Sequence, residues 1–277
     1  MLEIYLYQIF MLDTFPKISV ITVCYNAAHL LKKTIESVVE QSYQEIEYII
    51  IDGASNDNTK EFVESYGNKI LIFLSEPDTG LFDAMNKGIL KATGDLVIFL
   101  NAGDYYISCN VLEYAISQLK LSQAEVFFCR FIWETPCTKN IVVSDNSKVI
   151  FDWDLKSLNF PHPATIYKKD AFVKVGCFDL AYTILADYEW NVRALVKMKI
   201  PFQYVDIITV KFTADGISNN ADNKTLIETQ NERINNEYYQ PAWIYNIFKY
   251  PEKDTRFIHF FKKVIGRFYR KRINKVY

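Results

Sequence analysis

Polar side chains stand at the ends of four apolar runs in the first 106 residues of the chain. The set comprises Tyr25, Asn26, Asp52, Asp78, Asn101 and Asp104. Asp52 directly follows "YIII", where a charge is shielded from water and is costly unless another group pairs with it. Asp104 ends the stretch "LVIFLNAGD", whose unbroken apolar part is typical of a strand buried on both faces. These residue types predict a ligand-binding site, provided that the fold brings them together.

Strands that alternate with helices would position these residues. The apolar runs predict strands at 18–23, 46–51, 70–75 and 96–100, and the segments between them have the apolar spacing of helices. This alternation predicts an α/β fold with a doubly wound parallel sheet. Because parallel strands share one direction, the polar ends of the four strands are expected on one edge, where open α/β sheets bind ligands.

Each polar segment also has a plain structural explanation. Asp57-Asn58-Thr59 is suited to cap the helix that follows it, and Asp78-Thr79-Gly80 is suited to form a turn. Asp104 follows a glycine and has the same two alternatives, a turn or a helix cap. The convergence of the four segments indicates a site more strongly than any one segment does.

The composition is that of a globular protein with a sizeable core. Of the 277 residues, 50% are hydrophobic and 23% are charged, which excludes a disordered chain. The formal net charge of −2 gives no reason to expect nucleic acid as a partner. The five cysteines are scattered and form no Cys-x-x-Cys pair, so they indicate neither a disulfide framework nor a zinc site. The expected compartment is therefore a reducing one, the cytoplasm.

The motifs together resemble those of the family-2 glycosyltransferases. The resemblance rests on "ISVITVCYNAAHLL", on "IEYIIIDGASNDNT" and on "SEPDTGLFDAMNKGILKATGDLVIFLNAGD", and it covers roughly residues 17–215. It implies an inverting enzyme of the GT-A fold, a Rossmann-like, mostly parallel sheet flanked by helices. It further implies transfer of a hexosyl or hexosaminyl group from a nucleotide-diphosphate sugar to a hydroxyl of a glycan or lipid-linked saccharide.

The resemblance assigns the polar strand ends to the sugar donor. Asp52 would contact the base or ribose of the nucleotide, Asp78 would shape the same pocket, and Tyr25 and Asn26 would complete it.

The segment Asn101-Ala102-Gly103-Asp104 would occupy the place of the family's metal-binding Asp-x-Asp element. Only one carboxylate stands there, so Asp104 is the expected ligand of Mg²⁺ or Mn²⁺, and the donor diphosphate would supply further oxygens. Asn101 would provide either an oxygen ligand or only a hydrogen bond.

A second group of residues would serve the acceptor. Asp187 in "ILADYEWNVRAL" resembles the family's catalytic aspartate, a general base that takes the proton of the acceptor hydroxyl, and its alternative is a helix N-cap. Glu189 is the second choice for the base. His162 matches a family histidine near the acceptor or a donor phosphate, although Pro163 replaces the usual glutamine, and its alternative is a structural role. Trp190 would stack on a sugar ring or lie in the core.

The chain is expected to have three parts. These are an N-terminal extension (1–16), a GT-A domain (17–215) with a nucleotide-sugar half (17–106) and an acceptor half (107–215), and a helical C-terminal region (216–277). Its end, 257–277, has the pattern of a basic amphipathic helix, which predicts contact with the inner face of a membrane or packing on the body. Met11 is an alternative initiator, and in that case residues 1–10 would not belong to the natural protein. The oligomeric state is not predicted.

Two other functions share parts of this pattern. A nucleotidyltransferase has a related sheet, but it needs a glycine-rich, basic loop after the first strand, and "VCYNAAHLL" has no glycine, lysine or arginine. A catalytically impaired nucleotide-sugar-binding protein fits the single carboxylate at Asp104. A dehydrogenase is disfavoured because no Gly-x-Gly-x-x-Gly follows the first strand.

Overall fold

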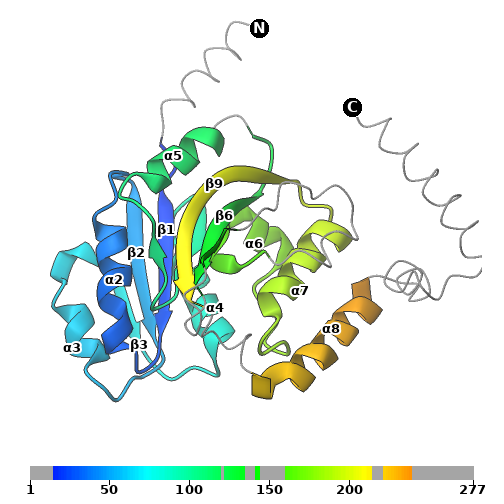
Figure 1. Cartoon of the computed structure of the whole chain (residues 1–277), viewed down its shortest axis with the longest axis horizontal. Helices are drawn as coiled ribbons and strands as arrows, with labels where there is room; N and C mark the ends of the chain where they lie inside the picture. The colour runs from blue at the N-terminus through cyan, green and yellow to red at the C-terminus, as the bar shows by residue number, and fades with distance from the viewer. Residues whose placement is uncertain (1–14, 120–121, 135–140, 144–159, 214–220, 239–277) are drawn as a thin grey trace, which may run out of the picture. The chain divides into compact units, whose positions relative to one another are not determined.

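A computed structural model describes residues 15–119, 122–134, 141–143, 160–213 and 221–238 (Figure 1). The chain divides into two compact units, residues 1–227 and 228–277, whose described parts are treated separately. Within the described residues, nine strands form one mixed sheet in the order β3-β2-β1-β4-β8-β6-β9-β5, and β7 pairs with β6.

The elements follow the predicted alternation through the first half of the chain. The strands are β1 (Ile18–Cys24), β2 (Ile46–Asp52), β3 (Ile72–Ser75), β4 (Leu96–Phe99), β5 (Tyr105–Tyr106), β6 (Val126–Glu134), β7 (Ile141–Val143), β8 (Thr165–Lys168) and β9 (Phe202–Thr213). The α-helices are α2 (Ala28–Val39), α3 (Thr59–Glu64), α4 (Leu81–Lys91), α5 (Val111–Leu119), α6 (Lys169–Val175), α7 (Ala186–Val192) and α8 (Lys224–Tyr238). Short helical turns are η1 (Gly67–Lys69), η3 (His162–Ala164), η4 (Arg193–Lys197) and η6 (Ala221–Asn223).

The first four strands are parallel, as the sequence predicts. β1 lies between β2 and β4, and β3 pairs with β2. In this register Cys24 lies beside Asp52, and Asp52 lies beside Ser75. The polar residues that follow these strands therefore share one edge of the sheet, here called the carboxyl edge.

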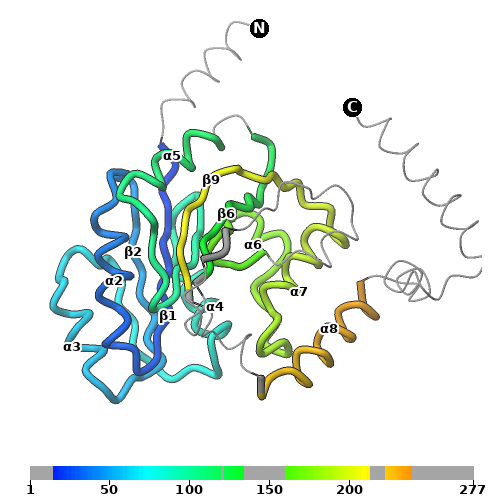
Figure 2. Tube along the Cα trace, viewed as in Figure 1, coloured from blue at the N-terminus to red at the C-terminus, as the bar shows by residue number. Residues whose placement is uncertain are grey.

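The second half of the chain adds antiparallel strands to this sheet. β8 pairs antiparallel with β4, with Ile98 opposite Ile166, and it also pairs antiparallel with β6. β9 runs parallel to β6 with a shifted register, and Figure 2 shows the two strands side by side. Because β8 runs opposite to β4, the residues just before β8 meet the carboxyl edge. The structure thus extends the predicted parallel sheet into a curled, mixed one.

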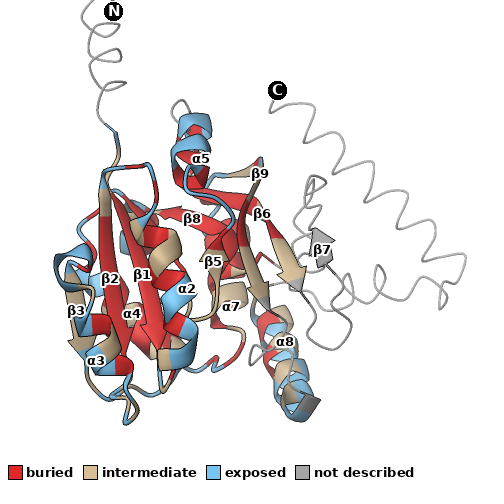
Figure 3. Cartoon of the chain, turned by 60° about the vertical axis from the view of Figure 1, so that its left-hand side comes forward, coloured by how far each residue is buried: buried red, intermediate tan, exposed pale blue. Residues whose placement is uncertain are grey.

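Helices cover both faces of the sheet, and the central strands between them are buried (Figure 3). On one face the apolar side of α2, with Leu31, Ile35 and Val38, belongs to the same core cluster as α5. On the other face α4 approaches β1 closely at Gly88, where an added Cβ would lie 2.5 Å from Ile21. Full burial of one such aliphatic side chain is worth about 1.5–3 kcal/mol.

Three parts of the prediction fall wholly or mainly outside the described residues. They are the N-terminal extension up to residue 14, the boundary at 215/216 and the basic segment 257–277, and all three stay predictions. α8 is a helix within the predicted helical C-terminal region. None of the helices in the described ranges combines the length and the apolar character that a membrane crossing requires.

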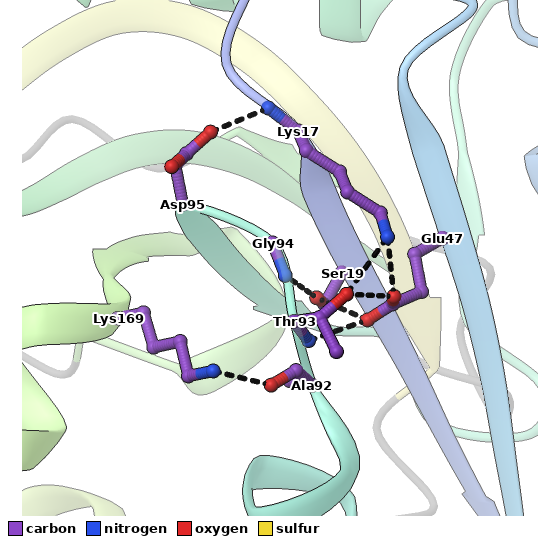
Figure 4. A network of polar contacts seen from close by, with 8 residues as sticks. All are labelled: Lys17, Ser19, Glu47, Ala92, Thr93, Gly94, Asp95 and Lys169. Atoms are coloured by element: carbon purple, nitrogen blue, oxygen red, sulfur yellow. Dashed lines mark hydrogen bonds and ion pairs between the residues drawn. The ribbon is translucent and has the colours of Figure 1, made fainter.

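A polar network ties β1 and β2 to the segment that leads into β4, at the end of the strands opposite to the carboxyl edge (Figure 4). Glu47 is 1% exposed and accepts hydrogen bonds from Lys17 Nζ (2.6 Å), Ser19 Oγ (2.8 Å) and the Thr93 backbone N–H (2.7 Å). Burial alone raises the pKa of Glu47, but these donors outweigh it and hold the pKa at about 2. The ionised carboxylate is therefore the form that the folded protein stabilises.

Glu47→Gln is expected to lower the free energy of unfolding at pH 7 by about 2 kcal/mol, because the buried carboxylate loses charge-assisted hydrogen bonds. A carboxyl whose pKa is depressed by folding contributes stability above its ordinary pKa of 4.5 and loses it as the pH falls toward 2. The difference between the two proteins should therefore shrink below pH 4.5 in urea unfolding measured from pH 7 to pH 3.

Glu64→Gln is the matched control, since Glu64 is exposed and pairs only distantly (4.0 Å) with Lys60. It should change the unfolding free energy by less than about 0.5 kcal/mol at every pH. Equal effects of the two substitutions would contradict the role given to Glu47.

Candidate active site

The loops that follow β1 and β2 are joined by hydrogen bonds. The Asn26 backbone N–H donates to Ser55 Oγ (2.7 Å), and Asn26 Oδ1 accepts from the Asn56 N–H (3.0 Å). Asn26 and Ala54 both have positive φ angles, 49° and 60°, which non-glycine residues adopt mainly where the surroundings impose them. The two loops therefore form one rigid rim of the carboxyl edge.

The Asp52 carboxylate is fully buried under this rim. It accepts hydrogen bonds from the Ser55 N–H (3.0 Å), the Ser55 hydroxyl and the Ser75 hydroxyl (2.6 Å). Burial of the Asp52 charge is costly, as noted from the sequence, and these hydroxyl and amide donors offset that cost. Direct contact between Asp52 and a nucleotide stays a prediction, and it would require Ser55 to move.

Tyr25 and Asp78 flank Gly53 at the same rim. A Cβ at Gly53 would lie 2.5 Å from Asp78 Oδ2 and 3.4 Å from Tyr25 Cδ2, so glycine leaves room for the Asp78 carboxylate in its present position. The Tyr25 side chain is 62% exposed, whereas Asp78 is partly buried and accepts a hydrogen bond from the Gly80 N–H (2.9 Å). The structure brings Tyr25, Asp52 and Asp78 together as the sequence predicts, and Gly53 is a contributor that sequence reasoning missed.

The segment after β4 forms a tight turn that is anchored on α2. The Gly103 N–H donates to Thr34 Oγ1 (2.9 Å), and the Asp104 N–H donates to the Asn101 carbonyl (3.0 Å). Gly103 has a φ of 99°, which favours glycine. Burial raises the pKa of the Asp104 carboxyl to about 7, although the nearby His162 acts to lower it. A carboxylate in this state lacks a compensating positive charge.

His162 joins this turn to the second half of the chain. Its Nε2 lies 2.8 Å from Asn101 Nδ2, and its Nδ1 lies 2.8 Å from Asp187 Oδ2. The histidine is 9% exposed, and the rings of Phe82 and Phe99 pack edge-on against it. The structure places His162 beside Asp187, the predicted base, and adds the link to Asn101. Its role near the acceptor or a donor phosphate and its structural alternative both stay predictions.

Asp187 lies in the first turn of α7 and is not its N-cap. The N-cap is Leu185, and Asp187 Oδ1 accepts a hydrogen bond from the Tyr188 N–H (2.8 Å). The Asp187 side chain is 16% exposed, so it is shielded but open to solvent. This position allows an acceptor hydroxyl to reach the carboxylate.

The geometry argues against acceptor roles for Glu189 and Trp190. The Glu189 carboxylate is 1% exposed and binds Arg193 through two hydrogen bonds (2.9 and 3.1 Å), so it is not available as a base. The Trp190 indole is 0% exposed, and its N–H donates to the Gly176 carbonyl (2.7 Å). Because no face of the indole is open, it packs in the aromatic core and cannot stack on a sugar.

The turn after β4 provides oxygen donors that fit a hard divalent cation. Asn101 Oδ1 is buried and has no hydrogen-bond partner among the described residues, and the Asp104 carboxylate lacks compensation. The described ranges contain no cluster of three or more His, Cys, Asp or Glu that would hold a metal ion without other ligands. Mg²⁺ and Mn²⁺ take few protein ligands when phosphates and water supply the rest, so the two residues fit such an ion together with a diphosphate.

The sequence matches a known protein family and known relatives. The model of the family described as glycosyl transferase family 2 matches residues 19–179. The uncharacterized glycosyltransferase Rv1514c of Mycobacterium tuberculosis is 32% identical over 187 residues, which cover 65% of this chain and 69% of that protein.

Comparison with solved structures supports the fold. S. aureus TarS 1–349 in complex with UDP-GlcNAc superposes with a TM-score of 0.60 at 19% identity, over 71% of this chain and 58% of that one. The mannosyltransferase PcManGT from Pyrobaculum calidifontis, in complex with GDP-Man and Mn²⁺, gives a TM-score of 0.54 at 18% identity, over 75% and 63%. The chain thus spans less than two thirds of either solved chain, and the likeness shows a GT-A-like α/β fold.

Asp104→Asn is expected to raise the free energy of unfolding at pH 8 by up to about 4 kcal/mol and to change it little at pH 4. Folding raises the pKa of Asp104 from 3.8 to about 7, so the folded state holds an extra proton between these values. Stability of the unsubstituted protein should therefore fall as the pH rises from about 4 to 7, and the variant should escape this loss. Urea unfolding from pH 4 to pH 8 measures the difference.

The matched control is Asp170→Asn, because Asp170 is exposed on α6. Its effect should stay below about 0.5 kcal/mol and should not vary across this pH range. A pH-independent effect of Asp104→Asn would contradict the charge imbalance inferred at the turn.

Proposed function

Because this chain belongs to glycosyl transferase family 2, we propose that it transfers a hexosyl or hexosaminyl group from a nucleotide-diphosphate sugar to a hydroxyl. The acceptor is a glycan or a lipid-linked saccharide, and the configuration at the anomeric carbon is inverted. The reaction takes place in the cytoplasm, including the inner face of the cell membrane.

One observation carries this proposal: a single hydrogen-bonded chain, Asn101–His162–Asp187, spans the carboxyl edge. It connects the oxygen donors of the turn after β4 with a shielded carboxylate on α7. Inverting transfer needs these two elements near one another, because the leaving diphosphate and the attacking hydroxyl act on the same anomeric carbon. The two hydrogen bonds of His162, each 2.8 Å, support such proximity.

The residues of the site have separate tasks in this reaction. The exposed Tyr25 ring is placed to stack on the nucleotide base, and the rim formed with Asp52 and Asp78 shapes the pocket around it. Asp187 accepts the proton of the acceptor hydroxyl while that oxygen bonds to the anomeric carbon and the bond to the diphosphate breaks.

Asp104 and Asn101 Oδ1 would hold the divalent cation against the donor diphosphate. A cation at this place neutralises the negative charge that develops on the leaving group. Mn²⁺ in complex with GDP-Man in the Pyrobaculum mannosyltransferase supports a divalent ion here. With one carboxylate in the turn, we expect the protein to bind the cation weakly until the diphosphate adds its own oxygens.

The donor and the cation should stabilise the protein only in combination. A matching nucleoside diphosphate at 100 times its Kd with Mn²⁺ should add about 2.7 kcal/mol to the unfolding free energy. Thermal unfolding with UDP, GDP and dTDP, each with and without Mn²⁺, measures this as a rise in Tm. Asp104→Ala should abolish the Mn²⁺-dependent part of the rise, while Asp170→Ala should keep it.

A rise in Tm that is independent of Mn²⁺ would contradict the metal role of Asp104. Stabilisation by donors with no transfer to any hydroxyl would favour the alternative of a catalytically impaired binding protein.

Asp187→Asn should lower kcat by about 10³-fold, because an amide cannot take the proton of the acceptor. The Kd of the donor should change less than about twofold, since the substitution preserves shape and lies on the acceptor side. Single-turnover transfer and donor titration measure the two quantities separately. Asp170→Asn serves as the control with unchanged rate, and a normal rate in Asp187→Asn would assign the base to another residue.

A further inference from the structure

Both ring nitrogens of His162 lie within hydrogen-bond distance of partners of different character. Asp187 Oδ2 lies 2.8 Å from Nδ1 and, as a carboxylate oxygen, can only accept, so Nδ1 carries the hydrogen. Nε2 of a neutral imidazole is then the acceptor, and Asn101 Nδ2–H donates to it over 2.8 Å. The partners therefore select one tautomer of His162, the Nδ1–H form.

The same contact leaves the Asn101 oxygen on the far side of the amide. Since its –NH₂ group donates to His162, its Oδ1 lies on the other side, where it is buried and has no partner among the described residues. A buried carbonyl oxygen without a donor is costly, unless a ligand binds it. Asp104, which lacks compensating charge, belongs to the same turn.

The imidazole ring itself is held in place. Phe82 and Phe99 pack against it with interplanar angles of 80° and 85° and centroid distances of 6.3 and 6.4 Å. Its own segment is short and stiff, because Pro161 and Pro163 flank it. These contacts hold the ring in one orientation. The ring therefore keeps both hydrogen-bond partners, Asn101 and Asp187, in fixed orientations.

We propose that His162 is a positioning residue that, as a single Nδ1–H tautomer, orients the Asn101 carbonyl toward the bound cation and the Asp187 carboxylate toward the acceptor. The part that concerns cation and acceptor rests on the function proposed above. The tautomer and the amide orientation are properties of the resting protein.

The same geometry explains why an amide replaces a carboxylate at position 101. An aspartate there would accept from Nε2, so both ring nitrogens would have to carry hydrogens, and the imidazole would become an imidazolium. A neutral ring satisfies one carboxylate and one amide donor, the combination Asp187 and Asn101. Asn101 and His162 are therefore a matched pair.

Imidazole ¹⁵N chemical shifts of the resting protein test the tautomer directly, with no donor, metal or acceptor present. The chain has three histidines, and the signals that disappear in His162→Gln identify this one. At about pH 8 we expect a protonated Nδ1 and an unprotonated Nε2. An Nε2–H form, or the averaged shifts of a tautomer mixture, would overturn the proposal while leaving the function untouched.

Asn101→Asp should shift His162 to a ring with a protonated Nε2. Although this substitution restores the second carboxylate of the family's metal element, we expect kcat to fall at least about tenfold, because Asp187 loses its neutral partner. An unchanged ¹⁵N spectrum, or a kcat equal to or above that of the unsubstituted enzyme, would refute the matched pair.

Two substitutions of His162 separate positioning from packing. His162→Phe keeps the aromatic contacts and removes both hydrogen bonds, whereas His162→Gln retains one amide donor and one acceptor. We expect about 100-fold lower kcat in His162→Phe with a donor KM within about threefold, and at least tenfold recovery in His162→Gln. Full activity of the Phe variant would contradict a positioning role. The same would follow if the Phe and Gln variants had the same kcat and the same Tm, both below those of the unsubstituted enzyme.

Discussion

The antiparallel pairing of β8 with β4 is the contact on which the candidate site depends. The four parallel strands place Tyr25, Asp52 and Asp78 on one edge, but they supply neither His162 nor Asp187. Because β8 enters next to β4 in the opposite direction, with Ile166 opposite Ile98, the turn η3 lies beyond the end of β4. Asn101 and His162, 61 positions apart in the chain, thereby come into contact, and α7 follows with Asp187.

Two carboxylates at opposite edges of the sheet, Glu47 near the start of β2 and Asp104 in the turn after β4, have opposite effects on stability. Glu47 is surrounded by donors and has a pKa of about 2, so its charge stabilises the fold. Asp104 has few donors and a pKa of about 7, so its charge opposes the fold. Uncompensated groups of this kind are typical of sites that a ligand completes. The difference supports the carboxyl edge as the candidate functional site.

Local patterns in the sequence predict the first four strands, their parallel direction and the meeting of Asp52, Asp78 and Asp104 at one edge. They do not predict that Ser55 and Ser75 satisfy Asp52, because those bonds depend on loop conformation and strand register. The Glu189–Arg193 pair has the spacing of a helical ion pair, a signal that would have removed Glu189 from the candidate bases. The burial of Trp190 depends on aromatic partners from several elements, which no local pattern reveals.

Electrostatics at the carboxyl edge favour a single carboxylate near the diphosphate. A divalent cation with one carboxylate keeps a net positive charge, which attracts the donor diphosphate, whereas two carboxylates would neutralise it. In the proposed site, neutral Asn101 would contribute an oxygen without adding charge, and its amide donor would suit the Nδ1–H imidazole of His162 beside Asp187. The charge of the histidine matters for the proposed base, Asp187. An imidazolium beside the Asp187 carboxylate would stabilise its negative charge and so weaken its attraction for the acceptor proton. In the proposed mechanism, the amide at position 101 would therefore serve the leaving group and, through one imidazole ring, the attacking group.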